Sequence, residues 1–210
     1  MKGWRYQSAL YALILLLAGA WPCAADHKPA AAGKPEHPHP AQPPPKPLSP
    51  AHEYFPDVVL VNQDGQKMRL YSDLLKGKVV VINSFFTGCE GSCPVVAGTF
   101  AKIQEWLGDR LNKDVHLLSV SVDPEADTPA KLKAYADKLR AKPGWHFLTG
   151  PKRHVDWALY KLGHYVEAKE EHRNVIIVGN ESTGLWKKTL SLSEPEAVIR
   201  LVEGVLQDRG

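Results

Sequence analysis

The chain has 210 residues, 44% of them hydrophobic, and its formal net charge is +3. This length suits one ordinary domain with extensions and is short for two, and the hydrophobic content is enough for a packed core. Lys2 and Arg5 account for most of the net charge. The remaining chain is close to neutral, so we expect no nucleic acid partner, which would require a basic stripe or patch.

The first 25 residues have the pattern of an export signal. Lys2 and Arg5 precede an apolar run, and small residues at 23–25 allow cleavage before Asp26. If it is not cut, the uncharged stretch 6–25 is just long enough to span a bilayer. A signal peptide and a signal anchor are therefore both open, and lipidation of Cys23 is a further alternative that is disfavoured by Pro22, which stands where such sites use a small residue. In either case we expect the folded part to be exported, either periplasmic or membrane-anchored with the domain facing the periplasm.

Residues 26–52 are predicted to form a Pro/His-rich linker. Nine of the 17 prolines of the chain lie between residues 26 and 50, with almost no large apolar side chains among them. This composition is typical of an extended spacer. His27, His37 and His39 are able to collect metal ions, although a solvated spacer explains them more simply. The folded domain is therefore predicted over 53–210.

Apolar strands and amphipathic helices alternate from residue 53 onward. Two short strands flank Asp64-Gly65, which favours a hairpin. Four successive β-branched residues at 79–82 indicate a strand covered on both faces. In chain order, the first half is predicted to contain strands at 58–61 and 67–70, a short turn at 72–75, a strand at 78–83, and a helix carrying Val96, Phe100, Ile103 and Leu107.

The second half continues the alternation. Thr128-Pro129 predicts a helix start, since the hydroxyl caps the helix and the proline suits its first turn. Ser193 and Glu196 predict a capping box at the start of the last helix. The predicted elements are a strand at 115–122, a helix at 128–139, a strand at 145–148, a helix at 155–162, a hairpin of 175–178 with 184–190, and a helix from 193 to 205.

This order predicts the α/β class, with a mixed sheet flanked by helices on both faces. Cys89 and Cys93 fall between the first buried strand and the helix that follows it. That position makes a thioredoxin-like fold with an N-terminal hairpin the leading expectation.

The exported part contains two cysteines, Cys89 and Cys93; a third, Cys23, lies in the signal region. Exported cysteine pairs usually become structural disulfides. A bridge between Cys89 and Cys93 would close a very short loop, and short loops gain little from cross-linking. Redox or metal chemistry is therefore the better explanation of this pair.

The spacing around the pair favours metal binding. Pro94 at the first helical position would make Cys93 the N-cap or its neighbour, where the helix dipole favours a thiolate. Three residues separate the cysteines, which lets both sulfurs point at a third group. Two thiolates suit Cu(I), and an added imidazole gives a site that also holds Cu(II). Zinc in a structural site and iron–sulfur clusters normally require four protein ligands. Because the exported part contains no second cysteine pair, both fit this chain less well than copper.

Three motifs together resemble the Sco/SenC family: Cys89-x-x-x-Cys93-Pro94, then Asp123-Pro124-x-x-Asp127-Thr128-Pro129, then a histidine before a late apolar strand. The resemblance runs from about residue 53 to the C-terminus. It implies a thioredoxin-like copper protein, often membrane-tethered, that assists assembly of the dinuclear copper centre in subunit II of cytochrome c oxidase. By position, the implied copper ligands are Cys89, Cys93 and His172. The family usually has a small hydroxyl residue where Arg173 stands.

Three carboxylates are candidates for supporting roles. We expect Asp123 to end its strand near the cysteine loop, Asp127 to help cap the next helix, and Glu171 to orient His172. Loop and cap chemistry, or a solvated charge, is the alternative for each. Among the histidines that compete with His172, His116 is predicted to pack within a strand and His164 to follow a helix end. His146 and His154 are predicted to be superficial.

Two functional hypotheses follow. The first is a copper metallochaperone that receives Cu(I) or Cu(II) from a donor chaperone and passes it to cytochrome c oxidase subunit II or another cuproprotein. The second is a thiol–disulfide oxidoreductase in which Cys89 and Cys93 are the redox-active pair. Thioredoxin-type oxidoreductases place a cis-proline before the strand that faces their cysteines, whereas residues 172–178 contain no proline. That difference favours metal binding, and the two hypotheses are compatible. A peroxidase ranks third.

Overall fold

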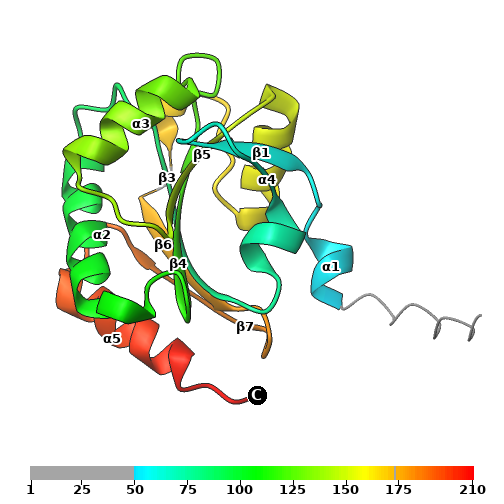
Figure 1. Ribbon diagram of the computed structural model, residues 1–210, viewed down its shortest axis with the longest axis vertical. Helices are drawn as coiled ribbons and strands as arrows, with labels where there is room; N and C mark the ends of the chain where they lie inside the picture. Colours follow the sequence, from blue (N-terminus) through cyan, green and yellow to red (C-terminus); the bar gives the residue numbers. More distant parts are fainter. Residues whose placement is uncertain (1–49, 173) are drawn as a thin grey trace, which may run out of the picture. The chain divides into compact units, whose positions relative to one another are not determined.

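A seven-stranded mixed sheet forms the centre of the folded domain (Figure 1). The structure is a computed structural model and describes residues 50–172 and 174–210. The predicted export segment, the linker as far as residue 49, and Arg173 lie outside the described residues. The described part belongs to one compact unit.

The strand order in the sheet is β2-β1-β5-β4-β3-β6-β7. The three central strands β5, β4 and β3 are parallel, and the strands on either side of them run antiparallel to their neighbours. The strands are β1 (Val59–Asn62), β2 (Lys67–Arg69), β3 (Val79–Phe85), β4 (Val115–Ser121), β5 (Trp145–Thr149), β6 (Val175–Asn180) and β7 (Leu185–Leu190).

Helices cover both faces of this sheet, as the composition of its strands requires. All seven residues of β3 and all seven of β4 are buried, so neither face of the central strands can meet solvent. The helical elements are α1 (Pro50–Tyr54), η1 (Leu70–Leu75), α2 (Cys93–Leu107), η2 (Gly108–Arg110), α3 (Pro129–Lys138), α4 (Lys152–Leu162), η3 (Lys169–Glu171) and α5 (Pro195–Leu206).

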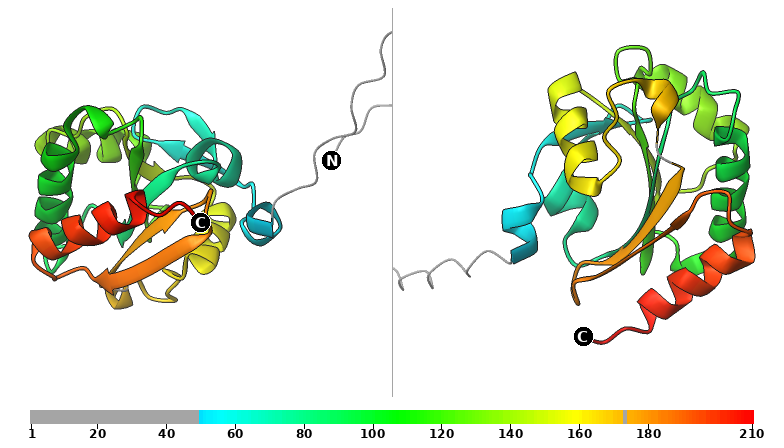
Figure 2. Two further views of the ribbon diagram at one scale, coloured as in Figure 1. Left: turned by 90° about the horizontal axis from the view of Figure 1, so that it is seen from below. Right: turned by 180° about the vertical axis from the view of Figure 1, so that it is seen from behind.

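The core consists of two apolar layers, one on each side of the sheet. Alternate residues of β3 point to opposite layers: Val81 packs with α2, α3 and α5, whereas Ile82 packs with α4 and η1. The two views in Figure 2 show α2 and α5 together on one side and α4 with α1 on the other. These observations confirm the predicted α/β class, the mixed sheet and the N-terminal hairpin.

The connection from β3 to β4 passes through α2 and is the unit that positions the cysteines. β3 and β4 are parallel along their whole length, from Val79 opposite Val115 to Phe85 opposite Ser121. Parallel neighbours need a long crossover, usually a helix. The loop that leads from the end of β3 into α2 therefore lies at the carboxyl edge of the sheet, beside the end of β4.

One predicted helix start is wrong. Helix α5 begins at Pro195, and Glu194 is its N-cap residue without a side-chain capping bond. The expected capping box of Ser193 and Glu196 does not form. Pro195 occupies the first helical position, which moves the N-cap to Glu194, and the Ser193 hydroxyl instead lies 3.2 Å from the hydroxyl of Thr189. The predicted turn at 72–75 is part of the short π-helical element η1.

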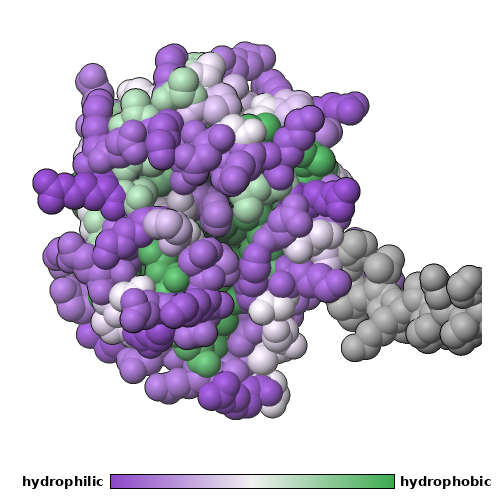
Figure 3. All heavy atoms as spheres, in the orientation of Figure 1, coloured by the Kyte–Doolittle hydropathy of each residue, from purple (hydrophilic) through white to green (hydrophobic). Residues whose placement is uncertain are grey.

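Most of the surface seen in Figure 3 is hydrophilic, and apolar side chains show only in small groups. Within the described residues, no helix has the length and apolar character needed to cross a membrane. The large apolar side chains that remain exposed include Val95, Trp157, Tyr160 and Leu190.

Candidate metal centre

The cysteine loop spans the seven residues between β3 and α2. The amide of Cys89 donates to the carbonyl of Phe86 over 3.1 Å, which closes a turn at the start of the loop. Cys93 is the first residue of α2, with Ser92 at the N-cap and Pro94 at the second helical position. Cys93 is therefore the neighbour of the N-cap, as predicted. Its side chain is buried, whereas Cys89 is partly exposed.

The fold brings His172 to this pair from 79 residues away in the sequence. His172 Nε2 lies 3.5 Å from Cys93 Sγ. One ligand atom from each of Cys89, Cys93 and His172 lies within 4.8 Å of the others. Among the described residues, no other group of three or more histidine, cysteine, aspartate or glutamate side chains comes together in this way.

The imidazole of His172 is oriented by its other nitrogen. His172 Nδ1 lies 3.1 Å from the carbonyl oxygen of Lys169, so Nδ1 carries the proton and donates it to that oxygen. Nε2, which faces Cys93, is then the basic nitrogen that is able to bind a metal. The ring also meets Phe86 edge-on, with centroids 5.6 Å apart at 90°. Glu171, which was expected to orient His172, is exposed, and the carbonyl of Lys169 performs this role.

Lys169 connects the histidine segment to the end of β4. Its Nζ donates to Asp123 Oδ2 over 2.6 Å and lies 5.5 Å from the centroid of the Phe86 ring. This hydrogen bond to the Asp123 carboxylate raises the pKa of Lys169. Asp123 therefore lies near the cysteine loop, as expected, and its carboxylate is engaged by an ammonium group.

Asp127 holds the cysteine loop to the sheet. Its side chain is buried, and its carboxylate accepts hydrogen bonds from the amide and hydroxyl of Thr87 and from the hydroxyl of Ser121 at 2.6 Å. The expectation that Asp127 caps the next helix is wrong, because the hydroxyl of Thr128 accepts from the amide of Lys131 and caps α3. A buried carboxylate needs several donors; the cysteine loop supplies two of them at Thr87, two residues before Cys89, and β4 supplies the third at Ser121.

A further polar contact joins the start of α2 to the segment after the histidine. Ser92 Oγ donates to Asn174 Oδ1 over 2.7 Å. Sequence reasoning missed Phe86, Thr87, Lys169 and Asn174. No motif marks them, because their contacts join segments that are far apart in the sequence.

The protonation state of Cys93 differs from the expectation. Burial raises the pKa of the Cys93 thiol to about 12, and a hydrogen bond with Cys89 adds to the rise. The predicted thiolate at the helix N-terminus is thus wrong for the metal-free protein. The side chain is 4% exposed, and desolvation of the charged form outweighs the helix dipole. A metal ion must displace this proton in order to bind the sulfur.

The other described histidines lie outside this cluster. His116 is buried in β4, as predicted, with its ring stacked against that of His146 at 6.2 Å. His154 Nδ1 lies 2.9 Å from the carbonyl of Val59, and His164 Nδ1 lies 3.1 Å from Ser84 Oγ. His146 and His154, which were expected to be superficial, are both of intermediate burial.

The donor set of two sulfurs and one imidazole nitrogen fits copper. Thiolates are soft ligands that suit Cu(I), and imidazole extends the site toward Cu(II). The two free cysteines also lie close enough for a redox reaction with each other after a small movement. The geometry therefore permits both metal binding and dithiol chemistry.

Comparison with known proteins gives a family match. The SCO1/SenC family model matches residues 48–203. The SCO1 protein homolog of Bacillus subtilis is 41% identical over 90 residues, which are 42% of this chain and 45% of that protein. The match thus spans about half the length of this relative.

Solved structures of similar proteins share the fold. A SCO1/SenC family lipoprotein from Bacillus anthracis has a TM-score of 0.62 at 27% identity, over 73% of this chain and 95% of that one. BsSco has a TM-score of 0.59 at 28% identity, over 72% of this chain and 94% of that one. BsSco is described as a member of the Sco family of cytochrome c oxidase assembly proteins, with a disulfide switch.

Proposed function

Because this chain belongs to the SCO1/SenC family, we propose that it is an exported copper metallochaperone whose ligands are Cys89, Cys93 and His172. The observation that carries the proposal is the convergence of two sulfurs and one imidazole nitrogen within 4.8 Å. Each donor suits copper, and the contact of His172 Nδ1 with the carbonyl of Lys169 leaves Nε2 directed at the Cys93 sulfur.

Delivery proceeds by exchange of ligands, without a change in the oxidation state of copper. Thiolates of the acceptor bind the metal as Cys89, Cys93 and His172 leave it one at a time. The protons released by the acceptor thiols are taken up by the departing cysteines. Because Cys89 and His172 are partly exposed, an incoming ligand is able to reach the metal before the last protein ligand dissociates.

The acceptor that we propose is the dinuclear copper site of cytochrome c oxidase subunit II. Support comes from the family, and from the description of BsSco, 28% identical to this chain, as belonging to the cytochrome c oxidase assembly proteins. We further propose that the domain acts in the periplasm, after export directed by residues 1–25, whether these are cut or kept as an anchor.

A second candidate function uses the same cysteines. As a reduced dithiol, Cys89 and Cys93 would reduce a disulfide of the target, transferring two electrons and two protons and becoming a disulfide themselves. The disulfide switch described for BsSco favours this activity. It would prepare the cysteines of an acceptor for copper.

The test compares Cu(I) and Cu(II) titrations of the reduced full chain with those of His172→Ala. Two thiolates satisfy Cu(I) in two-coordinate fashion, so its affinity is expected to change little. Cu(II) affinity is expected to fall by more than about tenfold, since even outer-shell partners of a ligand are worth about 10–100-fold.

His154→Ala is the matched control, because this partly buried histidine lies outside the cluster. Unchanged Cu(II) affinity in His172→Ala would contradict the assignment of His172 as a copper ligand. Efficient disulfide turnover by copper-free protein, unaffected by His172→Ala, would make the oxidoreductase the principal function.

A further inference from the structure

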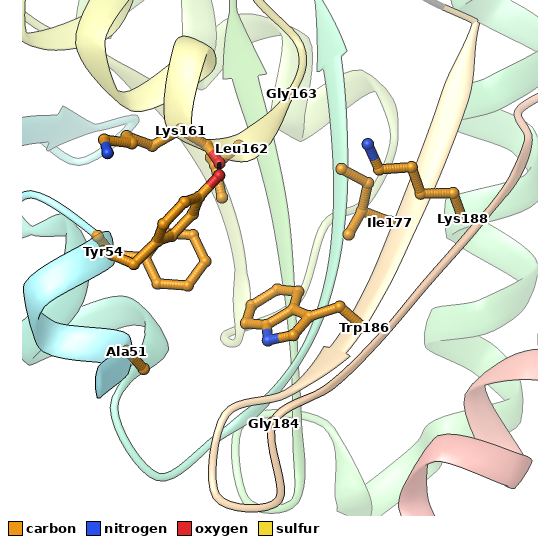
Figure 4. A pocket seen from close by; sticks show the side chains of 10 residues that line it. Ala51, Tyr54, Lys161, Leu162, Gly163, Ile177, Gly184, Trp186 and Lys188 are labelled. Carbon is orange, nitrogen blue, oxygen red and sulfur yellow. Dashed lines mark hydrogen bonds between the residues drawn. The ribbon is translucent and has the colours of Figure 1, made fainter. Parts of the chain in front are cut away.

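A large pocket of the described residues lies away from the metal centre. It has a volume of about 440 Å³ and opens between α1, the end of α4 and the β6–β7 pair (Figure 4). Its apolar walls include Phe55, Leu162, Ile177 and Trp186. This size and lining are typical of sites for small molecules.

The indole of Trp186 is held in place by a glycine on the neighbouring strand. Gly179 lies opposite Trp186 in the register of β6 and β7. A Cβ atom on Gly179 would lie 2.1 Å from the indole, so only glycine lets the ring lie flat across β6. On its other side the indole contacts the ring of Phe55, with centroids 5.2 Å apart. The tryptophan wall of the pocket is thus a fixed surface.

Two lysines and no carboxylates line this pocket. Figure 4 shows Lys161 and Lys188 on opposite sides of it. Lys188 Nζ lies 3.1 Å from the position that a Cβ on Gly163 would take, so the side chain extends across toward the end of α4. Within 50–172 and 174–210, neither lysine forms an ion pair with a carboxylate. The pocket therefore combines apolar walls with uncompensated positive charge.

Exposed aromatic side chains extend the apolar surface beyond the pocket. Lys161 Nζ lies over the rings of Tyr54 and Trp157, at 4.5 and 5.2 Å. Trp157 stacks on Tyr160, with centroids 5.5 Å apart. These three aromatic side chains are 45–61% exposed. Such amphipathic rings beside lysines suit a ligand with an apolar body and a charged head.

The pocket is separate from the proposed copper site. Its walls belong to the layer packed against α4 and η1, whereas Cys93 and α2 belong to the layer on the other side of the sheet. No residue lines both. A molecule bound in the pocket would leave Cys89 and His172 accessible.

We propose that this pocket binds an amphiphilic anion, a molecule with an apolar body and a carboxylate or phosphate head group. The apolar body would occupy the space between Trp186, Phe55 and Ile177. The head group would lie at the rim, where Lys188 supplies the opposite charge. A neutral or cationic amphiphile would lack that charge-assisted contact.

The test follows the indole N–H signal of Trp186 by NMR in the full chain, assigned through Trp186→Phe. The probes are decanoate, decanol and decyltrimethylammonium, each below its aggregation concentration. Decanoate is expected to shift the signal saturably and to bind at least about tenfold more tightly than decanol, as a hydrogen bond to a charged group predicts. Decyltrimethylammonium is expected not to bind.

Lys188→Met should weaken decanoate binding by about tenfold and leave decanol unaffected. Lys187→Met is the matched control, because Lys187 is the adjacent exposed residue of β7, lies opposite Val178 rather than Ile177, and does not line the pocket. Equal binding of decanoate and decanol, equal effects of the two lysine variants, or an unmoved Trp186 signal would each overturn the proposal.

A second probe separates two sources of the ligand. Dihexanoyl phosphatidylglycerol carries a phosphate head group and dissolves as a monomer. A Lys188-dependent response to this lipid that exceeds the response to decanoate supports a membrane phospholipid as the ligand. A response to decanoate alone supports a free carboxylate amphiphile.

Discussion

At the scale of single residues, Lys169 is not a ligand of the proposed copper site, but the geometry of the site depends on it. Its carbonyl accepts from His172 Nδ1, and its ammonium group pairs with Asp123 at 2.6 Å while lying over Phe86. One residue thereby fixes both the ring orientation of His172 and the position of its segment. The pair is partly shielded, since the Asp123 side chain is 17% exposed, so it should be stronger than an ordinary surface ion pair.

Lys169→Met removes the ammonium group but keeps the backbone carbonyl and a side chain of similar length. The segment that carries His172 should then no longer be held to Asp123. We expect Cu(II) affinity of the full chain to fall by about 10-fold, within the range for outer-shell partners of a metal ligand. Cu(I) affinity should change little. Loss of the histidine nitrogen signal in the electron paramagnetic resonance spectrum of the Cu(II) form would show that the variant acts through His172.

Lys152→Met is the matched control, because Lys152 forms a comparable 2.7 Å ion pair with Asp156 on α4. If both lysine variants bind Cu(II) as the unmodified chain does, Lys169 has no positioning role. If the unmodified chain itself fails to bind copper, the proposed function fails instead.

At the scale of elements, two helices with similar sequence signals begin in different ways. Thr128-Pro129 predicted a capped start for α3, and the Thr128 hydroxyl does accept from the amide of Lys131. Ser193 predicted a cap for α5, yet Pro195 sets the start of that helix and Glu194 stands at the N-cap. The difference is the position of proline: it directly follows Thr128 but lies two residues after Ser193.

This difference predicts unequal costs for two otherwise similar substitutions. Thr128→Ala should lower the free energy of unfolding by about 1 kcal/mol, the typical value of an N-cap. Ser193→Ala should lower it by less than about 0.5 kcal/mol, as for a surface residue outside such features. Urea unfolding of the two variants measures both values, and an equal loss would contradict the assignment of the helix starts.

At the scale of the whole molecule, the sheet contains a stacked histidine pair that should make its stability sensitive to acid. His116 on β4 and His146 on β5 stack at 6.2 Å. Burial lowers the pKa of His116 from 6.5 to about 4, with smaller contributions from the charges of Lys78 and His146. Burial and Lys78 also lower the pKa of His146, while Asp64 opposes the shift.

Because the folded pKa of His116 lies below the unfolded one, the unfolded chain binds more protons between the two values. Stability should therefore be fully present above pH 6.5 and decline as the pH falls toward 4. The full shift corresponds to about 3 kcal/mol, at ~1.4 kcal/mol per pKa unit. Urea unfolding across this range should show the decline, and His116→Gln should flatten it. An unchanged profile in His116→Gln would exclude this histidine as the cause.

The sequence by itself determined the elements and most of the ligand hypothesis. Four β-branched residues at 79–82 identified the buried strand, and the 3.6-residue spacing of apolar side chains identified α2. These signals are local, because periodicity reflects which face of an element is buried. The Cys89–Cys93 spacing is local too, and it narrowed the chemistry to redox or metal binding.

Only the tertiary structure decided which side chains surround the cysteines and in what state. The approach of His172 Nε2 to Cys93 joins residues 79 apart, and the attachment of Thr87 to Asp127 joins residues 40 apart. The Lys169 carbonyl, which orients His172 in place of Glu171, belongs to a residue whose side chain is paired with Asp123, 46 residues away. The raised pKa of Cys93 likewise follows from burial by distant residues. Local patterns carry no information on these contacts, since burial and pairing between distant segments arise when the chain packs both layers against one sheet.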